Sequence, residues 1–352
     1  MSEKLLMKGN EAIAEAAIQA GCLYFFGYPI TPQTELAAYM AKRMPKLGGT
    51  YLQAESEIAA INMVIGASAA GVRSMTSSSS PGISLKSEGI SYLVGCDLPA
   101  VIVNIQRGGP GLGGIQPSQA DYFMATKGPG HGDSHLIVLA PSTIQEIVEL
   151  VGEAFDMADI YRTPVMILGD GILGQMMEPV KFGTVNKRDV PPKTWACDGL
   201  PKEKRNIVNS LYLMPEELEQ LNIERFKKYD YIEKNEVKAE KFMVDDADIV
   251  IVAYGATARI AKNAVLAARE NGDKVGLIRP ITLWPFPKKI LKEAASTAKA
   301  MLVVEMSMGQ MVDDVKLAVD CSIPVHFCGR TGGMVPTPDD IAAALEKAKG
   351  GM

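Results

Sequence analysis

The sequence predicts an α/β protein made of two doubly wound parallel-sheet domains, and three observations carry this prediction. Short apolar runs alternate with helical segments in both halves of the chain, which is typical of sheets built from strand–helix–strand units. The 352 residues are enough for about two domains. Between the halves, residues 181–246 contain 26 Asp, Glu, Lys and Arg in 66 positions, whereas the whole chain is 22% charged. The predicted division is a domain over 1–180, a charged linker segment over 181–246 and a second domain over 247–352.

The elements of the first domain follow from capping signals and apolar runs. Asn10 is expected to cap a helix that continues to Gln19, and Thr31 to cap a second helix with Pro32 as its first residue. A third helix, Glu55–Gly71, is rich in Ala and Ile and should be mostly buried. The strands expected in this domain are Leu23–Phe26, Thr50–Gln53, Ser74–Ser77, Ala100–Gln106, Leu136–Ala140 and Pro164–Leu168.

The second half repeats this alternation after the charged segment. Within that segment, a helix beginning at Pro215 should bury a stripe formed by Leu218, Leu221, Phe226, Tyr229 and Ile232. The strands expected beyond it are Ile249–Tyr254, Lys274–Ile278, Met301–Glu305 and Pro324–Phe327, with helices between them and a terminal helix.

Composition excludes several classes of function. The net charge of −5 argues against nucleic-acid binding, because nothing in the balance offsets phosphate charge. The five cysteines form no Cys-x-x-Cys pair, which argues against a zinc or iron–sulfur site held by this chain alone and against a disulfide framework. No apolar run approaches the roughly 18–20 residues of a membrane span, and no secretory signal is evident. We therefore expect a cytoplasmic protein that binds no metal by itself.

A glycine-rich segment after the Ala100–Gln106 strand raises the alternative of nicotinamide dinucleotide binding. Gly109–Gly114 satisfies the pattern G-x-G-x-x-G, and Asp133 follows about 20 residues later, as in dinucleotide-binding folds. However, Pro110 lies inside the turn, and Pro117 would interrupt the helix that should begin at the last glycine. A nicotinamide-dependent dehydrogenase is therefore kept only as an alternative.

Two further motifs suggest metal binding and are interpreted otherwise. Gly169-Asp170-Gly171 resembles the start of a diphosphate–magnesium motif, but the later asparagine is missing, because residues 194–201 read Thr-Trp-Ala-Cys-Asp-Gly-Leu-Pro. A strand followed by a turn is the better interpretation. His131, Asp133 and His135 place three metal-capable side chains within five residues, with no evident fourth ligand. We expect a flexible polar loop near an active site.

Glu57 and Arg107 are the candidates for ligand contacts. Glu57 enters a helix that is otherwise almost wholly apolar, and a buried carboxylate is costly without a specific partner. The alternative is an acid favoured by the dipole of the first helical turn. Arg107 follows the apolar strand Ala100–Gln106, where open α/β sheets place ligand contacts, and its planar fork suits a carboxylate. The alternative is a loop arginine in solvent, and spacing does not decide either case.

Several segments in the same order resemble a known family: the alpha-type subunits of thiamine-diphosphate-dependent 2-oxoacid:ferredoxin oxidoreductases. The resemblance rests on Gly9–Ala12, Gly27–Pro32, Gln53–Glu57 with Ala59-Ala60, Gln106–Pro110, Gly130–Asp133, Ala253–Gly255 and Arg279-Pro280. The stretch from Gly109 to Gln119 is most similar to the 2-oxoisovalerate (3-methyl-2-oxobutanoate, branched-chain) members. The 2-oxoglutarate members remain an alternative.

The resemblance implies a role for each matching residue. Glu57 matches the carboxylate that hydrogen-bonds the aminopyrimidine ring nitrogen of thiamine diphosphate and favours its imino tautomer. Thr31 matches a residue whose hydroxyl lies over the reacting carbon. Arg107 matches the arginine that receives the 2-oxoacid carboxylate. Pro29 and Ile30 would line the pyrimidine. The first domain would then be the pyrimidine-type domain, and the second a domain like the transketolase C-terminal domain, with no catalytic residue.

The resemblance also implies partners. A second subunit would supply the diphosphate half of the cofactor site with Mg²⁺, and cluster-bearing chains would carry the iron–sulfur clusters. The expected enzyme, a hetero-oligomer with two copies of this chain, converts a 2-oxoacid, coenzyme A and oxidised ferredoxin to acyl-CoA, carbon dioxide and reduced ferredoxin in anaerobic metabolism. A third alternative is a non-catalytic scaffold paralogue, against which the joint presence of Thr31, Glu57 and Arg107 argues.

Overall fold

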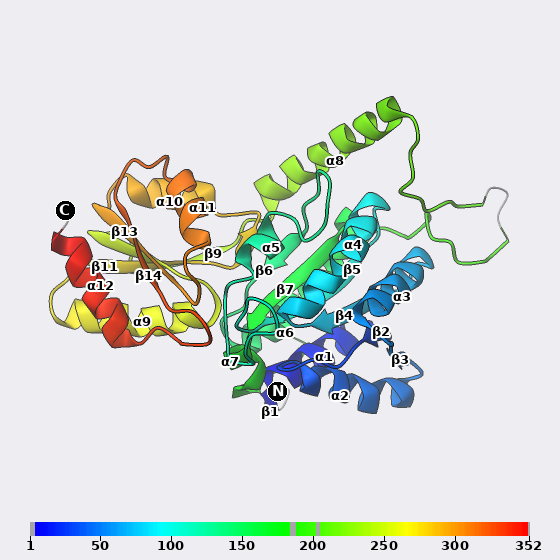
Figure 1. The fold of residues 1–352 in the computed structure, drawn as a ribbon, viewed down its shortest axis with the longest axis horizontal. Coiled ribbons are helices and arrows are strands. Elements are labelled where there is room, and N and C mark those ends of the chain that lie inside the picture. The colour runs from blue at the N-terminus through cyan, green and yellow to red at the C-terminus, as the bar shows by residue number, and fades with distance from the viewer. Residues whose placement is uncertain (1–3, 184–187, 202–204, 351–352) are drawn as a thin grey trace.

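The computed structural model describes residues 4–183, 188–201 and 205–350, and two separate parallel sheets organise these residues (Figure 1). Each of the three predicted segments includes a few positions outside the described residues. The predicted fold class, two doubly wound α/β units, is confirmed. None of the described helices is long and apolar enough to cross a membrane.

The larger sheet has seven strands, all parallel to their neighbours except the last of them in the chain. They are β2 (Tyr24–Gly27), β3 (Thr50–Gln53), β4 (Ser74–Ser78), β5 (Ala100–Gln106), β6 (Ile137–Leu139), β7 (Pro164–Asp170) and β12 (Thr282–Trp284), in the order β12-β6-β7-β5-β4-β2-β3. β12 comes from the second half of the chain and runs antiparallel to β6. A small antiparallel ladder, β1 (Leu5–Lys8) with β8 (Met177–Val180), lies apart from this sheet.

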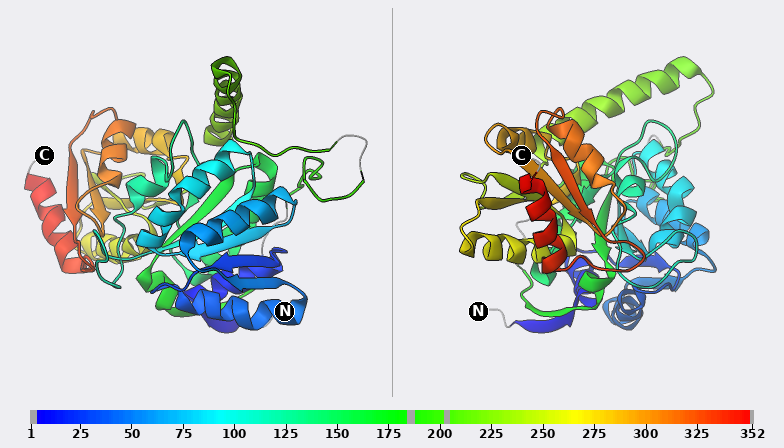
Figure 2. Two further views of the ribbon diagram at one scale, coloured as in Figure 1. Left: turned by 45° about the vertical axis from the view of Figure 1, so that its right-hand side comes forward. Right: turned by 60° about the vertical axis from the view of Figure 1, so that its left-hand side comes forward.

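Helices cover both faces of the larger sheet, because the crossovers run in both directions from β2. On one face α1 packs on α2 and α6, and on the other α3 packs on α4 (Figure 2). Their bounds are α1 (Gly9–Gln19), α2 (Thr34–Arg43), α3 (Glu57–Ala69), α4 (Ser80–Gly95) and α6 (Ile144–Tyr161), with a 3-10 turn, η1 (Met44–Leu47), after α2. Two short helices, α5 (Tyr122–Thr126) and α7 (Gly171–Gln175), follow the loops at the sheet edge.

The smaller sheet has five strands and its own helices. The strands are β9 (Ala239–Phe242), β10 (Ile249–Val252), β11 (Val275–Pro280), β13 (Ala300–Glu305) and β14 (Val325–Gly329), in the order β14-β13-β10-β11-β9. α9 (Gly255–Glu270) packs on α12 (Pro338–Gly350), and α10 (Lys288–Ala295) packs on α11 (Met311–Ala318). β9 lies within the charged segment and pairs antiparallel with β11. His326 lies in the edge strand β14.

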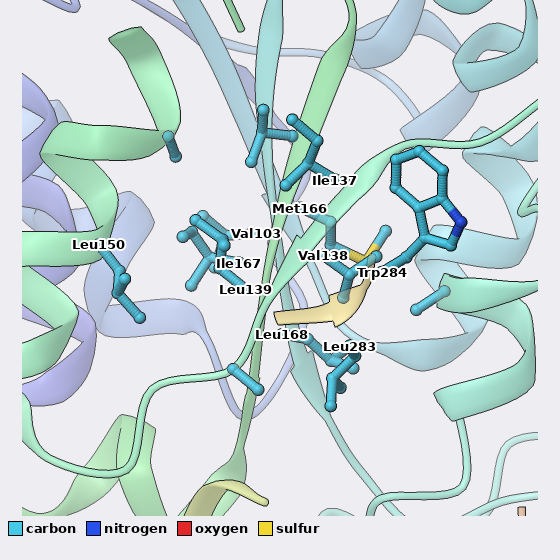
Figure 3. Close-up of a cluster of buried hydrophobic side chains, with 14 of the residues drawn as sticks. Val103, Ile137, Val138, Leu139, Leu150, Met166, Ile167, Leu168, Leu283 and Trp284 are labelled. Atoms are coloured by element: carbon cyan, nitrogen blue, oxygen red, sulfur yellow. The ribbon is translucent and has the colours of Figure 1, made fainter. Parts of the chain in front are cut away.

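A continuous apolar core joins the larger sheet to the second half of the chain. Alternate residues of β7 point to opposite faces, so that Ile167 lies on the side of Leu150 of α6, and Met166 on the side of Trp284 (Figure 3). Met166 and Ile167 are fully buried, and Trp284 is 7% exposed. Trp284 of β12 therefore covers the side of the core opposite to α6. This contact joins the two halves of the chain.

Two predicted helix caps are wrong, for one shared reason. α1 begins at Gly9 after the N-cap Lys8, so Asn10 lies inside the helix. The Asn10 amide instead donates a hydrogen bond to the Pro32 carbonyl at 2.8 Å. α2 begins only at Thr34 after the N-cap Gln33, and Thr31 lies in the loop before it. The loop before α2 is therefore held by a hydrogen bond between residues 22 positions apart, and not by the helix caps that were expected.

Two predicted burial patterns are only partly correct. α3 exposes one side, with Ile58 half exposed, although a mostly buried helix was expected. In α8 (Pro215–Asn235), Tyr229 and Ile232 are buried, whereas Leu218 and Phe226 are each 41% exposed. The N-terminal part of α8 projects past the edge of the first sheet, which explains why the predicted stripe is buried at only one end (Figure 1).

Candidate active site

The carboxyl edge of the larger sheet brings three predicted site residues together. β2 and β4 are neighbours, but the chain leaves them in opposite directions, towards β3 and β5 respectively. Loops that follow such a pair of strands diverge and leave a crevice, where ligands of open α/β sheets bind. Thr31 lies in the loop after β2, Glu57 begins the helix after β3, and Arg107 directly follows β5.

The Arg107 guanidinium is buried against backbone carbonyls. Its Nη1 donates to the Thr31 carbonyl at 2.9 Å and its Nη2 to the Leu112 carbonyl at 3.1 Å, while its buried Nε has no hydrogen-bond partner. The residue is 7% exposed, so the interpretation as a loop arginine in solvent is wrong. Among the described residues no carboxylate pairs with it. A buried guanidinium without a carboxylate is costly, which is the pattern of a site that receives an anion.

Glu57 is both a first-turn acid and a buried one. It opens α3 directly after Ser56, whose hydroxyl accepts a hydrogen bond from the Ala59 N–H at 3.2 Å. The residue is only 6% exposed. A Cβ on Gly82 of α4 would lie 2.7 Å from Oε1 of Glu57, so only a glycine lets α4 approach this carboxylate. Glu57 therefore occupies the first turn of α3 as a buried carboxylate, and its contact with a ligand stays a prediction.

Two serines beside Glu57 complete the polar edge. The hydroxyl of Ser78 would lie 2.0 Å from a Cβ on Gly82, which places it against the same gap as the Glu57 carboxylate. The hydroxyls of Ser78 and Ser79 are both buried without a hydrogen-bond partner in the structure. Unsatisfied buried hydroxyls are rare in folded proteins, and each needs an explanation, of which a bound group is one.

A buried lysine lies behind this edge and was not singled out from the sequence. Lys86 of α4 is fully buried, and its Nζ donates to Oγ1 of Thr76 at 2.8 Å and to the Ser77 carbonyl at 3.0 Å. Burial lowers the pKa of Lys86 to about 7, and the negative charge of Glu57 opposes that shift. The sequence holds a signal for it, because Lys86 falls at helical spacing between Ile83 and Ile90 on the buried face of α4.

The segment after Arg107 is a loop that lacks the structure of a dinucleotide-binding fingerprint. A dinucleotide fingerprint needs a helix at its last glycine, but the next helix, α5, begins only at Tyr122. The Gly114 N–H instead donates to the Gly108 carbonyl, which closes a tight turn. Asp121 anchors the far end, because its carboxylate accepts from the Ser80 hydroxyl at 2.6 Å and from the Asn104 amide at 2.9 Å. Burial raises the pKa of Asp121.

The two motifs that suggested a metal have other roles in the structure. The Asp170 carboxylate caps α7 by accepting from the Ile172 and Leu173 N–H groups, and burial raises its pKa to about 6. His135 stacks on Trp284 with ring centroids 4.8 Å apart, whereas His131 and Asp133 are exposed. The described residues contain no cluster of His, Cys, Asp and Glu placed to hold a metal ion.

Comparison with known proteins identifies the family of this chain. Residues 15–241 match the family described as pyruvate flavodoxin/ferredoxin oxidoreductase, thiamine diphosphate-binding, and residues 247–341 match core domain II of pyruvate:ferredoxin oxidoreductase. The chain is 49% identical to the ketoisovalerate oxidoreductase subunit VorB of Methanothermobacter marburgensis, over 98% of both chains. The chain belongs to the 2-oxoacid:ferredoxin oxidoreductase family. It is 37% identical to the 2-oxoglutarate synthase subunit KorA of the same organism, over 97% of this chain and 98% of that one.

Solved structures place this oxidoreductase subunit on the same fold. The 2-oxoglutarate:ferredoxin oxidoreductase of Magnetococcus marinus superposes with a TM-score of 0.88 at 30% identity. The alignment covers 98% of this chain and 65% of that one, so the present chain spans about two thirds of its length. A split-gene transketolase superposes with a TM-score of 0.61 at 16% identity, which shows a shared fold alone. The family and fold predicted from the sequence are both confirmed.

Proposed function

We propose that this chain is the pyrimidine-binding subunit of a coenzyme A-dependent 2-oxoacid:ferredoxin oxidoreductase that acts on 2-oxoisovalerate. The observation that carries the substrate is the 49% identity to a ketoisovalerate oxidoreductase subunit, against 37% to a 2-oxoglutarate synthase subunit. The products would be a branched acyl-CoA, carbon dioxide and reduced ferredoxin. 2-Oxoglutarate is the second candidate substrate, favoured by the superposition on a 2-oxoglutarate enzyme.

The polar edge fits the pyrimidine half of thiamine diphosphate. Glu57 offers a buried carboxylate there, and the Ser78 and Ser79 hydroxyls lack partners, as expected where a polar ring binds. When bound, the cofactor supplies a nucleophilic thiazolium carbon for attack on the 2-oxo group. Glu57 would hold a proton at the pyrimidine ring nitrogen. Pro29 and Ile30, in the loop after β2, would line that ring.

Arg107 and Thr31 would bind the substrate. The Nε of Arg107 is buried without a hydrogen-bond partner, and the planar fork of a guanidinium makes bidentate contacts with a carboxylate. Because Nη1 of Arg107 donates to the Thr31 carbonyl, the guanidinium and the loop after β2 are fixed relative to each other. The exposed Thr31 would then present its hydroxyl to the reacting 2-oxo group.

Partner subunits would complete the enzyme. Apolar side chains surround the polar edge in exposed positions, among them Ile58, Leu85 and Leu112. Exposed apolar surface of this kind is typical of protein interfaces. We assign the diphosphate half-site with its Mg²⁺ to one partner, the iron–sulfur clusters to cluster-bearing chains, and propose a cytoplasmic hetero-oligomer with two copies of this chain that reduces ferredoxin. The division into 1–180, 181–246 and 247–352 is proposed for this chain.

The test is an assay of the assembled enzyme without oxygen. The chain is co-expressed with its neighbouring subunits, and the reduction of a viologen dye is followed with 2-oxoisovalerate, pyruvate or 2-oxoglutarate, with and without coenzyme A. We expect coenzyme A-dependent reduction of the dye, fastest with 2-oxoisovalerate. Faster reduction with 2-oxoglutarate would move the chain to the second candidate. No reduction in a complex that contains thiamine diphosphate and clusters would contradict the enzymatic assignment.

A further inference from the structure

Gln119, at the end of the loop that follows Arg107, is bound entirely by the second half of the chain. Its side-chain Oε1 accepts from the Met306 N–H at 3.0 Å and from the Thr257 hydroxyl at 3.1 Å, and its Nε2 donates to the Tyr254 carbonyl at 2.9 Å. Its backbone N–H donates to the Met306 carbonyl at 2.9 Å, and its carbonyl accepts from the Tyr254 hydroxyl at 3.2 Å. The residue is fully buried, so every polar group of Gln119 is used in this contact.

The residues next to Gln119 add to the same contact. The Gln310 amide donates to the Ala120 carbonyl at 2.7 Å and accepts from the Phe123 N–H at 2.8 Å. Gln310 itself stands at the start of α11, in the smaller-sheet unit. The segment from 119 to 123 is therefore held by β10, β13 and the helices that follow them.

The backbone leads from Gln119 to Asp121, and hydrogen bonds lead from Asp121 to Arg107. Two residues further on, the Asp121 N–H donates to Oε1 of Gln106 at 3.1 Å, and the Asp121 carboxylate accepts from the Ser80 hydroxyl. The Ser80 hydroxyl oxygen in turn accepts from the Arg107 N–H at 3.0 Å. The loop returns to the Arg107 side chain as well, through the Leu112 carbonyl. Both the backbone and the guanidinium of Arg107 thus depend on where this loop is fixed.

We propose that Gln119 is a positioning residue through which the second domain sets the geometry of Arg107 and hence the affinity for the 2-oxoacid carboxylate. This inference rests on the proposed function, because it takes Arg107 as the substrate-binding arginine. It gives the second domain a part in substrate binding that passes through the loop after β5.

The chemistry of the contact defines two informative variants. Gln119→Met keeps the size of the side chain and removes its hydrogen bonds. Gln119→Glu keeps the acceptor for Met306 and Thr257 but turns a second oxygen towards the Tyr254 carbonyl, and two acceptors repel each other. When the introduced carboxyl is protonated, it donates to that carbonyl again, and burial raises the pKa of such a carboxyl. Lowering the pH should therefore restore the function of Gln119→Glu and leave Gln119→Met unchanged.

The control is another contact between the two halves that lies away from the loop. Arg259 of α9 donates through Nη1 to the Ser142 carbonyl at 3.1 Å and to Glu178 at 2.8 Å. Arg259→Met removes a comparable number of polar contacts without touching residues 107–121. Any effect that comes merely from loosening the two halves should appear in both variants.

The experiment measures kcat and KM for 2-oxoisovalerate in the assembled enzyme, and hydrogen exchange of residues 107–116 in the same preparations. We expect Gln119→Met to raise KM about tenfold with kcat within about twofold, equivalent to about 1.4 kcal/mol. Exchange in 107–116 should rise in this variant, Gln119→Glu should recover at lower pH, and Arg259→Met should match the wild type in both readouts. Unchanged exchange, or an unchanged KM despite faster exchange, would overturn the inference. A wild-type enzyme inactive with every 2-oxoacid would contradict the proposed function, and exchange would then decide the positioning claim.

Discussion

The carboxyl edges of the two sheets are built alike but differ in how their polar groups are satisfied. At the edge of the larger sheet, the hydroxyls of Ser78 and Ser79 and the Nε of Arg107 are buried without partners. At the edge of the smaller sheet, the Glu305 carboxylate accepts from the Ser307 hydroxyl and from the N–H groups of residues 310, 311 and 312. Arg279 there pairs with both Glu146 and Glu240, each at 2.8 Å.

We interpret this difference as one between a ligand-binding edge and a structural one. Folded proteins satisfy nearly all of their buried polar groups, and an unsatisfied cluster needs an explanation. Strand order and topology cannot distinguish the two edges, because both have parallel strands with helices on both faces. The hydrogen bonds can, and they favour ligand binding at the edge that carries Glu57 and Arg107. The following substitutions test this difference.

The largest effect is expected for Glu57→Gln. The substitution keeps the size of the side chain but removes a group that can hold a proton at the pyrimidine nitrogen, so turnover should fall by at least about 100-fold. Viologen reduction per assembled complex measures the loss. Glu305→Gln is the matched control at the other edge: it should lower the midpoint of thermal unfolding and leave turnover near wild type. The contrast fails if Glu57→Gln turns over like the wild type.

Lys86→Met should have the next largest effect, on stability. The folded-state pKa of Lys86, about 7, lies below its ordinary value of 10.5. Between these values the unfolded chain holds a proton that the folded chain lacks, so wild-type stability rises with pH across this window. Methionine removes the titrating group. The free energy of unfolding of Lys86→Met relative to wild type should therefore fall by about 2 kcal/mol between pH 6.5 and 8.5.

Urea unfolding of the full chain at the two pH values measures this change. Lys262→Met serves as the control, because Lys262 is partly exposed and is paired with Glu240 at 3.0 Å. A pH-independent difference between Lys86→Met and wild type would show that Lys86 stays charged behind the active edge. That result would remove the contrast between Lys86, which forms no ion pair with the described residues, and the doubly paired Arg279.

A smaller effect is expected for Arg107→Lys. A lysine is a point charge and does not reproduce the bidentate fork, so KM for 2-oxoisovalerate should rise about tenfold, or about 1.4 kcal/mol. Steady-state kinetics of the assembled enzyme give this value. Arg279→Lys, which breaks the fork at the structural edge, should lower the unfolding midpoint and leave KM unchanged. Equal changes of KM in both variants would indicate that Arg107 is structural as well.

Local sequence patterns predicted the strands better than the contacts between them. β3 and β5 match the prediction residue for residue, and β5 is an extended apolar run that carries its own signal. The predictions that Asn10 and Thr31 cap helices were wrong, because the hydrogen bond from the Asn10 amide to the Pro32 carbonyl sets the position of this loop. The pairing of β12 with β6 could not be predicted, because no local pattern encodes contacts between strands about 140 residues apart.

The candidate site divides in the same way. Glu57, Thr31 and Arg107 could be proposed from motifs, because each follows a recognisable strand or opens a helix. Ser79 and Gln119 could not, since their importance comes from which partners they lack or find in space. Lys86 had a usable signal, a lysine within an apolar helical stripe, that was not followed.

Hydrogen exchange of the assembled complex, with and without thiamine diphosphate and Mg²⁺, tests the central claim most directly. Ligand binding slows exchange where it fills unsatisfied groups and restrains the backbone. We expect protection in residues 28–33, 56–60 and 78–82, with no change in 305–312. Protection in 305–312 without protection at the other three segments would contradict it.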